Sequence, residues 1–154
     1  MILYHGSNMD FKTIDLSKCL PYKDFGKGFY LTTIRKDAIG RAKDKCRKEG
    51  RGVPTILSFR WDEDTKELNV KKFEKIDEEW TDFIIGNRNR RQNQKHDYDI
   101  VIGPVADDGV ILSLQLFEAR VIDKQTLMER LNYVRPTIQY CFCTQRAINT
   151  LKRI

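Results

Sequence analysis

Several features that would assign a chain quickly to a class of protein are missing from this sequence. Its 154 residues contain no apolar run approaching the length of a membrane-spanning helix. The first residues carry neither a basic region nor a cleavable apolar segment, so we expect no secretion signal. These absences predict a cytoplasmic protein that makes no membrane contact.

Cysteine and histidine are also scarce. The chain has four cysteines and two histidines, and no two cysteines have the C-x-x-C spacing of a zinc or redox site. We expect Cys141 and Cys143 to point to opposite faces of a strand and to remain unbridged. No carboxylate–cysteine grouping around His96 argues for a metal. We therefore expect free thiols in a reducing compartment and no bound metal.

The composition that is present is typical of a folded domain. Hydrophobic residues make up 40% of the chain and charged residues 32%, which excludes a disordered chain and suits one domain over residues 1–154. The net charge is +6. A basic surface favours an anionic partner, and both the pyrophosphate of NAD and a nucleic acid meet that requirement.

Strand and helix patterns alternate irregularly along the chain, which indicates an α+β fold and not a repeating βαβ series. We expect strands over 1–6, 28–33, 55–61, 68–73, 98–103 and 138–143, and helices over 35–48, 77–85, 110–118, 124–132 and 144–152. Thr33 and Thr144 are the predicted N-caps of the first and last helices. Residues 7–23 are expected to form an irregular loop over the site.

Two short motifs carry most of the functional information. The first, Leu3-Tyr4-His5-Gly6-Ser7, is an apolar strand ending in a polar triplet. The second, Phe25-Gly26-Lys27-Gly28-Phe29-Tyr30-Leu31-Thr32, is a glycine-rich turn that enters an aromatic strand. Histidine offers a donor and an acceptor, and glycine allows close approach to the backbone. Together the motifs favour a site for a flat, hydrogen-bonding ring attached to a sugar.

In this order the motifs resemble the ADP-ribosyltransferase superfamily, in the branch that includes diphtheria toxin and the poly(ADP-ribose) polymerases. A third strand of that branch carries a glutamate or its replacement, and here it corresponds to 138–142, with Gln139 at the matching position. Nearly the whole chain also resembles a family of small, largely uncharacterised bacterial proteins of this superfamily. The resemblance implies two small β-sheets packed around a nicotinamide cleft, with flanking helices.

The resemblance also implies roles for individual residues. His5 would contact the adenine-side ribose, with Ser7 bonding nearby, and Gly6 would present its backbone to the carboxamide of NAD. Tyr30 would stack on the nicotinamide ring. Tyr30 could equally be a core aromatic, since strands are rich in such residues. His5, Tyr30 and Gln139 are the candidate catalytic residues.

Three positions depart from the polymerase pattern. Ala38 stands where those enzymes have a carboxamide-binding serine, and Arg41 stands where they have a second stacking tyrosine. We expect Arg41 to reach the pyrophosphate or solvent. Gln139 carries no charge, so chain elongation is not expected, whereas mono-ADP-ribosyl transfer or NAD binding without activity are both open. Gln139 could also be only a polar residue at a strand start.

Other polar segments have competing interpretations. Asp99, Asp107 and Asp108 could orient an acceptor or act as a base, but capping of the following helix is favoured. The basic run 87–95 could bind a polyanion or be a solvated loop. The family resemblance and the small size imply mono-ADP-ribosyl transfer from NAD to a protein or nucleic-acid acceptor, as the toxin of a toxin–antitoxin pair with an antitoxin partner. The alternatives are an NAD-binding pseudoenzyme or a basic nucleic-acid-binding module.

Overall fold

The computed structural model describes residues 1–92 and 94–154, which form seven β-strands, five α-helices and one 3₁₀ helix. In chain order they are β1 (Ile2–Ser7), η1 (Leu16–Lys18), β2 (Phe29–Thr32), α1 (Arg35–Glu49), β3 (Thr55–Trp61), β4 (Val70–Lys72), α2 (Glu78–Arg88), β5 (Ile100–Pro104), α3 (Asp108–Glu118), α4 (Lys124–Leu131), β6 (Ile138–Phe142), α5 (Gln145–Ile148) and β7 (Leu151–Arg153). The predicted α+β class is confirmed.

All seven strands belong to one mixed sheet, in the order β4-β5-β6-β2-β1-β3-β7. The prediction of two separate sheets is therefore wrong, because strand pairing continues from one edge of the sheet to the other. The two halves of the sheet are nevertheless joined weakly at its centre. In the described chain, β1 and β2 share the single register pair Tyr4–Thr32, whereas β1 and β3 share six pairs.

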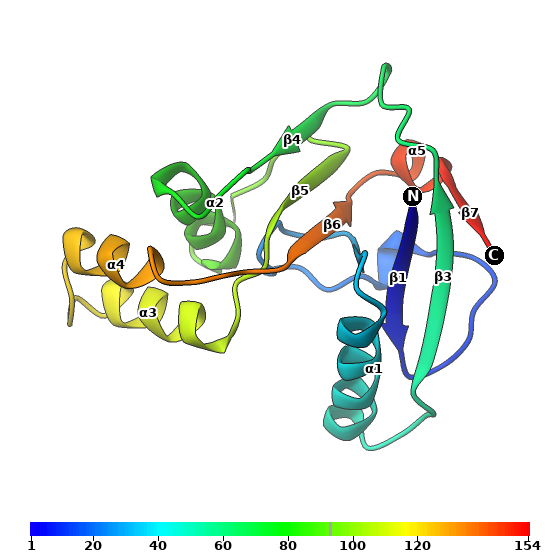
Figure 1. Cartoon of the computed structure of the whole chain (residues 1–154), viewed down its shortest axis with the longest axis horizontal. Helices are drawn as coiled ribbons and strands as arrows, with labels where there is room; N and C mark the ends of the chain where they lie inside the picture. The colour runs from blue at the N-terminus through cyan, green and yellow to red at the C-terminus, as the bar shows by residue number, and fades with distance from the viewer. Residues whose placement is uncertain (93) are drawn as a thin grey trace.

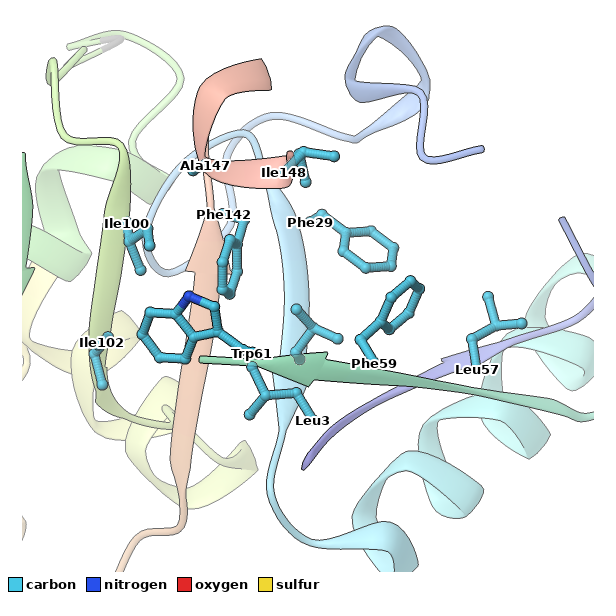
Figure 2. Packing of buried hydrophobic residues seen from close by; sticks show 11 residues of the cluster. Leu3, Phe29, Leu57, Phe59, Trp61, Ile100, Ile102, Phe142, Ala147 and Ile148 are labelled. Carbon is cyan, nitrogen blue, oxygen red and sulfur yellow. The ribbon is translucent and has the colours of Figure 1, made fainter. Parts of the chain in front are cut away.

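The sheet curls around an aromatic core (Figure 2). Two strands separate β3 from β6, which in a flat sheet would place them about 14 Å apart. Trp61 on β3 nevertheless packs edge-on against Phe142 and Tyr140 of β6, with ring centroids 5.3 and 5.9 Å apart. Phe29 and Phe59 point into the same interior (Figure 2). The curl thus lets strands from both halves of the sheet bury one shared core.

Helices cover the outer face of the sheet in two groups (Figure 1). Helix α1 packs on β1, whereas α2, α3 and α4 gather beside β5 and β6. A second core fills the space between those three helices and the strands, and its buried members include Phe25, Trp80, Val101, Leu114 and Leu127. Residues next to each other along β5 and β6 therefore belong to different cores, because side chains alternate between faces.

Local capping differs from the prediction at one helix and agrees at another. Ile34, and not Thr33, occupies the N-cap position of α1, and no side chain caps this helix. Thr144 caps α5 as predicted, with its side chain accepting from the Ala147 N–H.

The predicted C-terminal helix over 144–152 is too long, because the observed helix α5 ends at Ile148. The last residues instead pair as β7 with the edge of β3, which offers unpaired backbone groups.

The surroundings of Gly6 show how closely α1 packs on β1. A Cβ atom on Gly6 would lie 2.1 Å from the Ala38 carbonyl oxygen and 2.8 Å from the Ala42 backbone nitrogen. We expect Gly6→Ala to lower the free energy of unfolding by roughly 2 kcal/mol, a typical cost of overpacking. Gly40→Ala is the matched control, because its Cβ position has no neighbour within 4 Å.

The control substitution should raise stability by up to about 1 kcal/mol, since alanine is the better helix former. Urea unfolding followed by circular dichroism measures both variants. A Gly6→Ala protein as stable as wild type would contradict this packing.

Candidate functional site

Strands β1 and β2 separate beyond their one register pair, Tyr4–Thr32, and this strand parting lies beside His5, Gly6 and the backbone of Tyr30. The Met1 amino group and carbonyl both bond to the Trp61 backbone, so odd-numbered residues of β1 turn their backbone groups toward β3. Tyr4 and Gly6 therefore turn theirs toward β2. Tyr4 is paired there with Thr32. The N–H and C=O of Gly6 face the strand parting, where an amide could pair with them as a neighbouring strand does.

The His5 side chain bridges the strand parting. Its Nδ1 lies 2.8 Å from the Tyr30 carbonyl oxygen, and its ring stacks on Phe29 with centroids 4.3 Å apart. Because a carbonyl oxygen only accepts, we assign the hydrogen to Nδ1, and neutral His5 then presents Nε2 as an acceptor. Burial lowers the pKa of His5 to about 4. His5 is therefore neutral at pH 7.

Three cations surround His5. The charges of Lys45, Lys23 and Arg41 each contribute to the lowered pKa of His5, after the larger effect of burial. The Lys23 ammonium also lies 5.4 Å from the centroid of the Tyr30 ring. Among the described residues, no carboxylate forms an ion pair with any of the three. The mouth of the strand parting is thus positively charged and open to an anion.

Tyr30 is held rigidly by its hydroxyl. This group accepts from the Phe25 N–H at 3.0 Å and donates to the Gly26 carbonyl at 2.7 Å. Gly26 has φ +79°, a left-handed conformation that favours glycine, so the turn depends on this residue. Burial raises the pKa of Tyr30 well above its usual value. The hydroxyl therefore stabilises the turn through both of its hydrogen bonds. Only the ring of Tyr30 is left to contact a ligand.

Gln139 is buried and forms part of a charged network. Its Nε2 donates to the Asp24 carboxylate at 2.9 Å, and the other oxygen of Asp24 accepts from Arg88 Nη1 at 2.7 Å. The Ala106 N–H also donates to Asp24. Because a carboxylate facing Gln139 must accept, the amide nitrogen is turned toward it and Oε1 is turned away. Gln139 is thus oriented as a hydrogen-bond acceptor on its other side.

The predicted site residues are only partly brought together. His5 and Gly6 meet the backbone of Tyr30 at the strand parting, whereas the Tyr30 ring lies on the opposite face of the sheet from the His5 ring, beside the second core. Gln139 pairs with Thr32 on β2, so it is a diagonal neighbour of Tyr30, at a separation of about 7–8 Å. Ser7 is buried, and its hydroxyl accepts from the Met9 N–H. Arg41 is exposed on α1.

The acidic residues on either side of β5 have structural roles. Asp107 caps α3, as predicted, by accepting from the Val110 N–H at 2.9 Å. Asp99 is fully buried and accepts from Arg146 Nε and the Thr144 hydroxyl. The Arg146 hydrogen bonds lower the pKa of Asp99 to about 2. With its oxygens already bonded, Asp99 is not placed to act as a base on a ligand.

The basic run 87–95 is partly used within the protein. Arg88 pairs with Asp24, and the Arg90 guanidinium lies 5.2 Å from the Tyr22 ring centroid. Asn93, which belongs to the same run, lies outside the described residues. Two arginines of this segment, Arg88 and Arg90, therefore contact the loop residues Asp24 and Tyr22.

Sequence reasoning missed Asp24, Lys23 and Lys45. The only sequence feature that pointed to Asp24 is its position directly before the glycine-rich motif. The two lysines give no such signal, because exposed lysines occur throughout the chain. Within the described residues, no group of three or more His, Cys, Asp or Glu side chains could hold a metal ion. No helix there is long and apolar enough to cross a membrane.

A family model described as "Protein of unknown function (DUF3990)" covers residues 1–153. No curated protein and no solved structure matches the chain. The chemistry of the site must therefore be argued from its own residues.

The partly buried, neutral His5 predicts a pH dependence. Its pKa is about 4 in the folded chain against 6.5 for an ordinary histidine, so the unfolded chain takes up the proton first as the pH falls. Above pH 6.5 His5 is neutral in both states and the free energy of unfolding does not depend on its titration. As the pH falls from 6.5 toward 4, only the unfolded chain is protonated at His5, so the free energy of unfolding decreases. His5→Gln can still donate to the Tyr30 carbonyl but does not titrate.

We expect the urea midpoint of wild type to fall more steeply across this pH window than that of His5→Gln. Parallel pH profiles for the two proteins would contradict a His5 whose pKa is lowered in the folded chain.

Proposed function

Because the chain belongs to the DUF3990 family of proteins of unknown function, we propose an activity from the site itself: transfer of a single ADP-ribose group from NAD to a macromolecular acceptor. The observation that carries this proposal is the strand parting. It combines the free peptide edge of Gly6, the fixed ring of Tyr30 and the neutral imidazole of His5 within one short stretch of the sheet.

The nicotinamide half of NAD suits the inner part of this site. Its carboxamide has one donor and one acceptor, which match the C=O and N–H of Gly6. Its flat ring suits the face of Tyr30, where an aromatic contact excludes water. Lys23 now lies over that ring. Because the nicotinamide of NAD is cationic, its binding should displace the Lys23 ammonium toward the phosphates.

The anionic half of NAD suits the mouth of the site. Lys23, Arg41 and Lys45 provide three positive charges for the pyrophosphate, and all three act on His5, so they lie nearer the site than the other surface lysines. The Nε2 atom of neutral His5 can accept a hydrogen bond from a ribose hydroxyl. A protonated histidine could not accept this bond. The lowered pKa of His5 keeps the ring neutral, and Nε2 an acceptor, at neutral pH.

Gln139 has a role consistent with single transfer. Its Oε1 can accept from the ribose 2′-hydroxyl, while the Asp24 carboxylate behind it contributes negative charge near the ribose. Breaking the bond between nicotinamide and C1′ releases neutral nicotinamide and leaves positive charge on the ribose. An acceptor nucleophile then bonds to C1′ and loses its proton. Without a carboxylate at Gln139 to activate an acceptor ribose, chain extension is not expected.

One observation favours a second function, an NAD-binding pseudoenzyme. The Gln139 amide is neutral and already bonded to Asp24, so the site could retain binding without the charge that cleavage favours. Measurement of nicotinamide release separates the two functions, because a pseudoenzyme would bind NAD and leave it intact.

The primary test supplies labelled NAD and bacterial lysate to the purified protein. We expect label to be transferred to a macromolecule, and digestion with nuclease or protease to identify the acceptor class. Calorimetry with NAD alone tests binding in parallel. If millimolar NAD does not bind, both the transferase and the pseudoenzyme are excluded.

The cation cluster gives a binding prediction. Arg41→Gln/Lys45→Gln should weaken NAD binding by about tenfold or more, equivalent to about 1.4 kcal/mol, while binding of nicotinamide alone should hardly change. Lys36→Gln/Lys43→Gln removes the same charge from the opposite side of α1 and is the matched control. Equal losses of NAD affinity in the two double variants would contradict a localised phosphate site.

Gln139 gives a catalytic prediction. Gln139→Ala should abolish transfer and cost about 1–3 kcal/mol of stability, because Asp24 loses a buried partner. Gln139→Glu alone would face the Asp24 carboxylate and repel it. The exchanged pair Asp24→Asn/Gln139→Glu restores a donor–acceptor contact with the charge moved to β6.

We expect the exchanged pair to release nicotinamide faster than wild type, as measured by chromatography. Full activity in Gln139→Ala would place the catalytic group elsewhere. The same trace release from every variant and from wild type would favour the pseudoenzyme.

A further inference from the structure

Two thiols lie in contact beside the site. The Sγ atoms of Cys141 and Cys143 are 3.4 Å apart. The prediction that they point to opposite faces is wrong, because residues two positions apart in a strand share a face. Cys141 lies within β6, and Cys143 is the first residue beyond its last member, Phe142.

The pair is packed directly behind Tyr30. Cys141 is the register partner of Tyr30 on β2, and its Sγ lies 2.4 Å from the position that a Cβ on Gly28 would occupy. The sulfur thus fills the space that the glycine leaves free, under the turn that the Tyr30 hydroxyl secures. Cys141 is fully buried, whereas Cys143 is partly exposed. One thiol of the pair can therefore meet a reagent from solvent, and the other is reached only through its neighbour.

We propose that Cys141 and Cys143 form a reversible disulfide, a modification site that couples the thiol redox state to the position of Tyr30. The oxidant is a peroxide or a low-molecular-weight disulfide such as oxidised glutathione. The Cys143 thiolate attacks one sulfur of oxidised glutathione and releases glutathione thiolate. Cys141 then loses its proton and attacks Cys143, which releases the second glutathione. Two protein thiols are oxidised and one glutathione disulfide is reduced to two thiols.

The backbone geometry allows this bond. Two residues along a strand span about 6.6 Å, near the upper limit of the Cα separation that a disulfide bridges. Cys143 lies one residue beyond β6, and its N–H is bonded to the Asp99 carbonyl, so a shift of Cys143 toward Cys141 strains this one bond and no register pair of β6. The remaining cysteines, Cys19 and Cys46, are not in contact with each other or with this pair in the described hydrogen-bond network.

Disulfide formation would draw the Cys141 sulfur away from Gly28 and Tyr30. The turn that carries Gly26 and Phe25 would lose a packing contact, so the Tyr30 ring should be held less firmly. We expect oxidised protein to bind NAD several-fold more weakly than reduced protein. This consequence rests on the proposed function, whereas the disulfide itself does not.

The test uses the full chain in glutathione buffers of stepwise composition, followed by alkylation under denaturing conditions and tryptic mapping. Cys141 and Cys143 occur in one peptide, residues 131–146, because trypsin does not cleave before Pro136. We expect this peptide to lose two hydrogen atoms and resist alkylation as the buffer becomes oxidising, and a thiol reductant to reverse both changes. Cys19 and Cys46 should remain alkylated at the same buffer composition.

Cys143→Ser should abolish the modification, whereas Cys19→Ser and Cys46→Ser should leave it unchanged. Full alkylation of Cys141 and Cys143 in the most oxidising buffer would overturn the proposal, as would a bridge from Cys19 to either residue. If the disulfide forms and no preparation binds NAD, the proposed function fails and the modification site stands. If the disulfide forms and NAD affinity is unchanged, the coupling to Tyr30 is overturned.

Discussion

The hydrogen bond from His5 Nδ1 to the Tyr30 carbonyl is the contact on which the site depends. In an uninterrupted ladder a backbone N–H would satisfy that carbonyl, and the strands could not separate. Here a side-chain ring takes its place, so β1 and β2 part without leaving the carbonyl unpaired. The same bond determines the tautomer of His5 and leaves Nε2 as a hydrogen-bond acceptor. One contact therefore keeps the sheet continuous and frees the peptide edge of Gly6.

The curl of the sheet makes this arrangement stable. Because Trp61 on β3 reaches Phe142 on β6, the halves of the sheet are joined across their concave side as well as through the strands. Such aromatic contacts add to the burial of large side chains and offset the weak pairing at the centre. The strand parting can thus exist in the middle of a sheet that is otherwise curled around its own core (Figure 2).

Buried carboxylates hold the connecting loops around the site. Asp24 joins the end of α2 and strand β6 to the glycine-rich turn, and Asp99 joins β5 to the start of α5. Each carboxylate has several donors, which is the condition under which a buried charge is tolerated. Removal of one partner would leave an uncompensated charge, so these networks constrain the loops more strongly than surface ion pairs would.

The sequence by itself determined the local elements and the identity of the central residues. The strand over residues 55–61 and the caps at Asp107 and Thr144 depend on neighbours a few positions away, so pattern and spacing predicted them. Only the tertiary structure decided that the strands form one curled sheet, that the C-terminus pairs as β7, and that Asp24 orients Gln139. The last contact joins residues 115 positions apart. No local pattern encodes such a separation, because chain folding alone brings the two groups together.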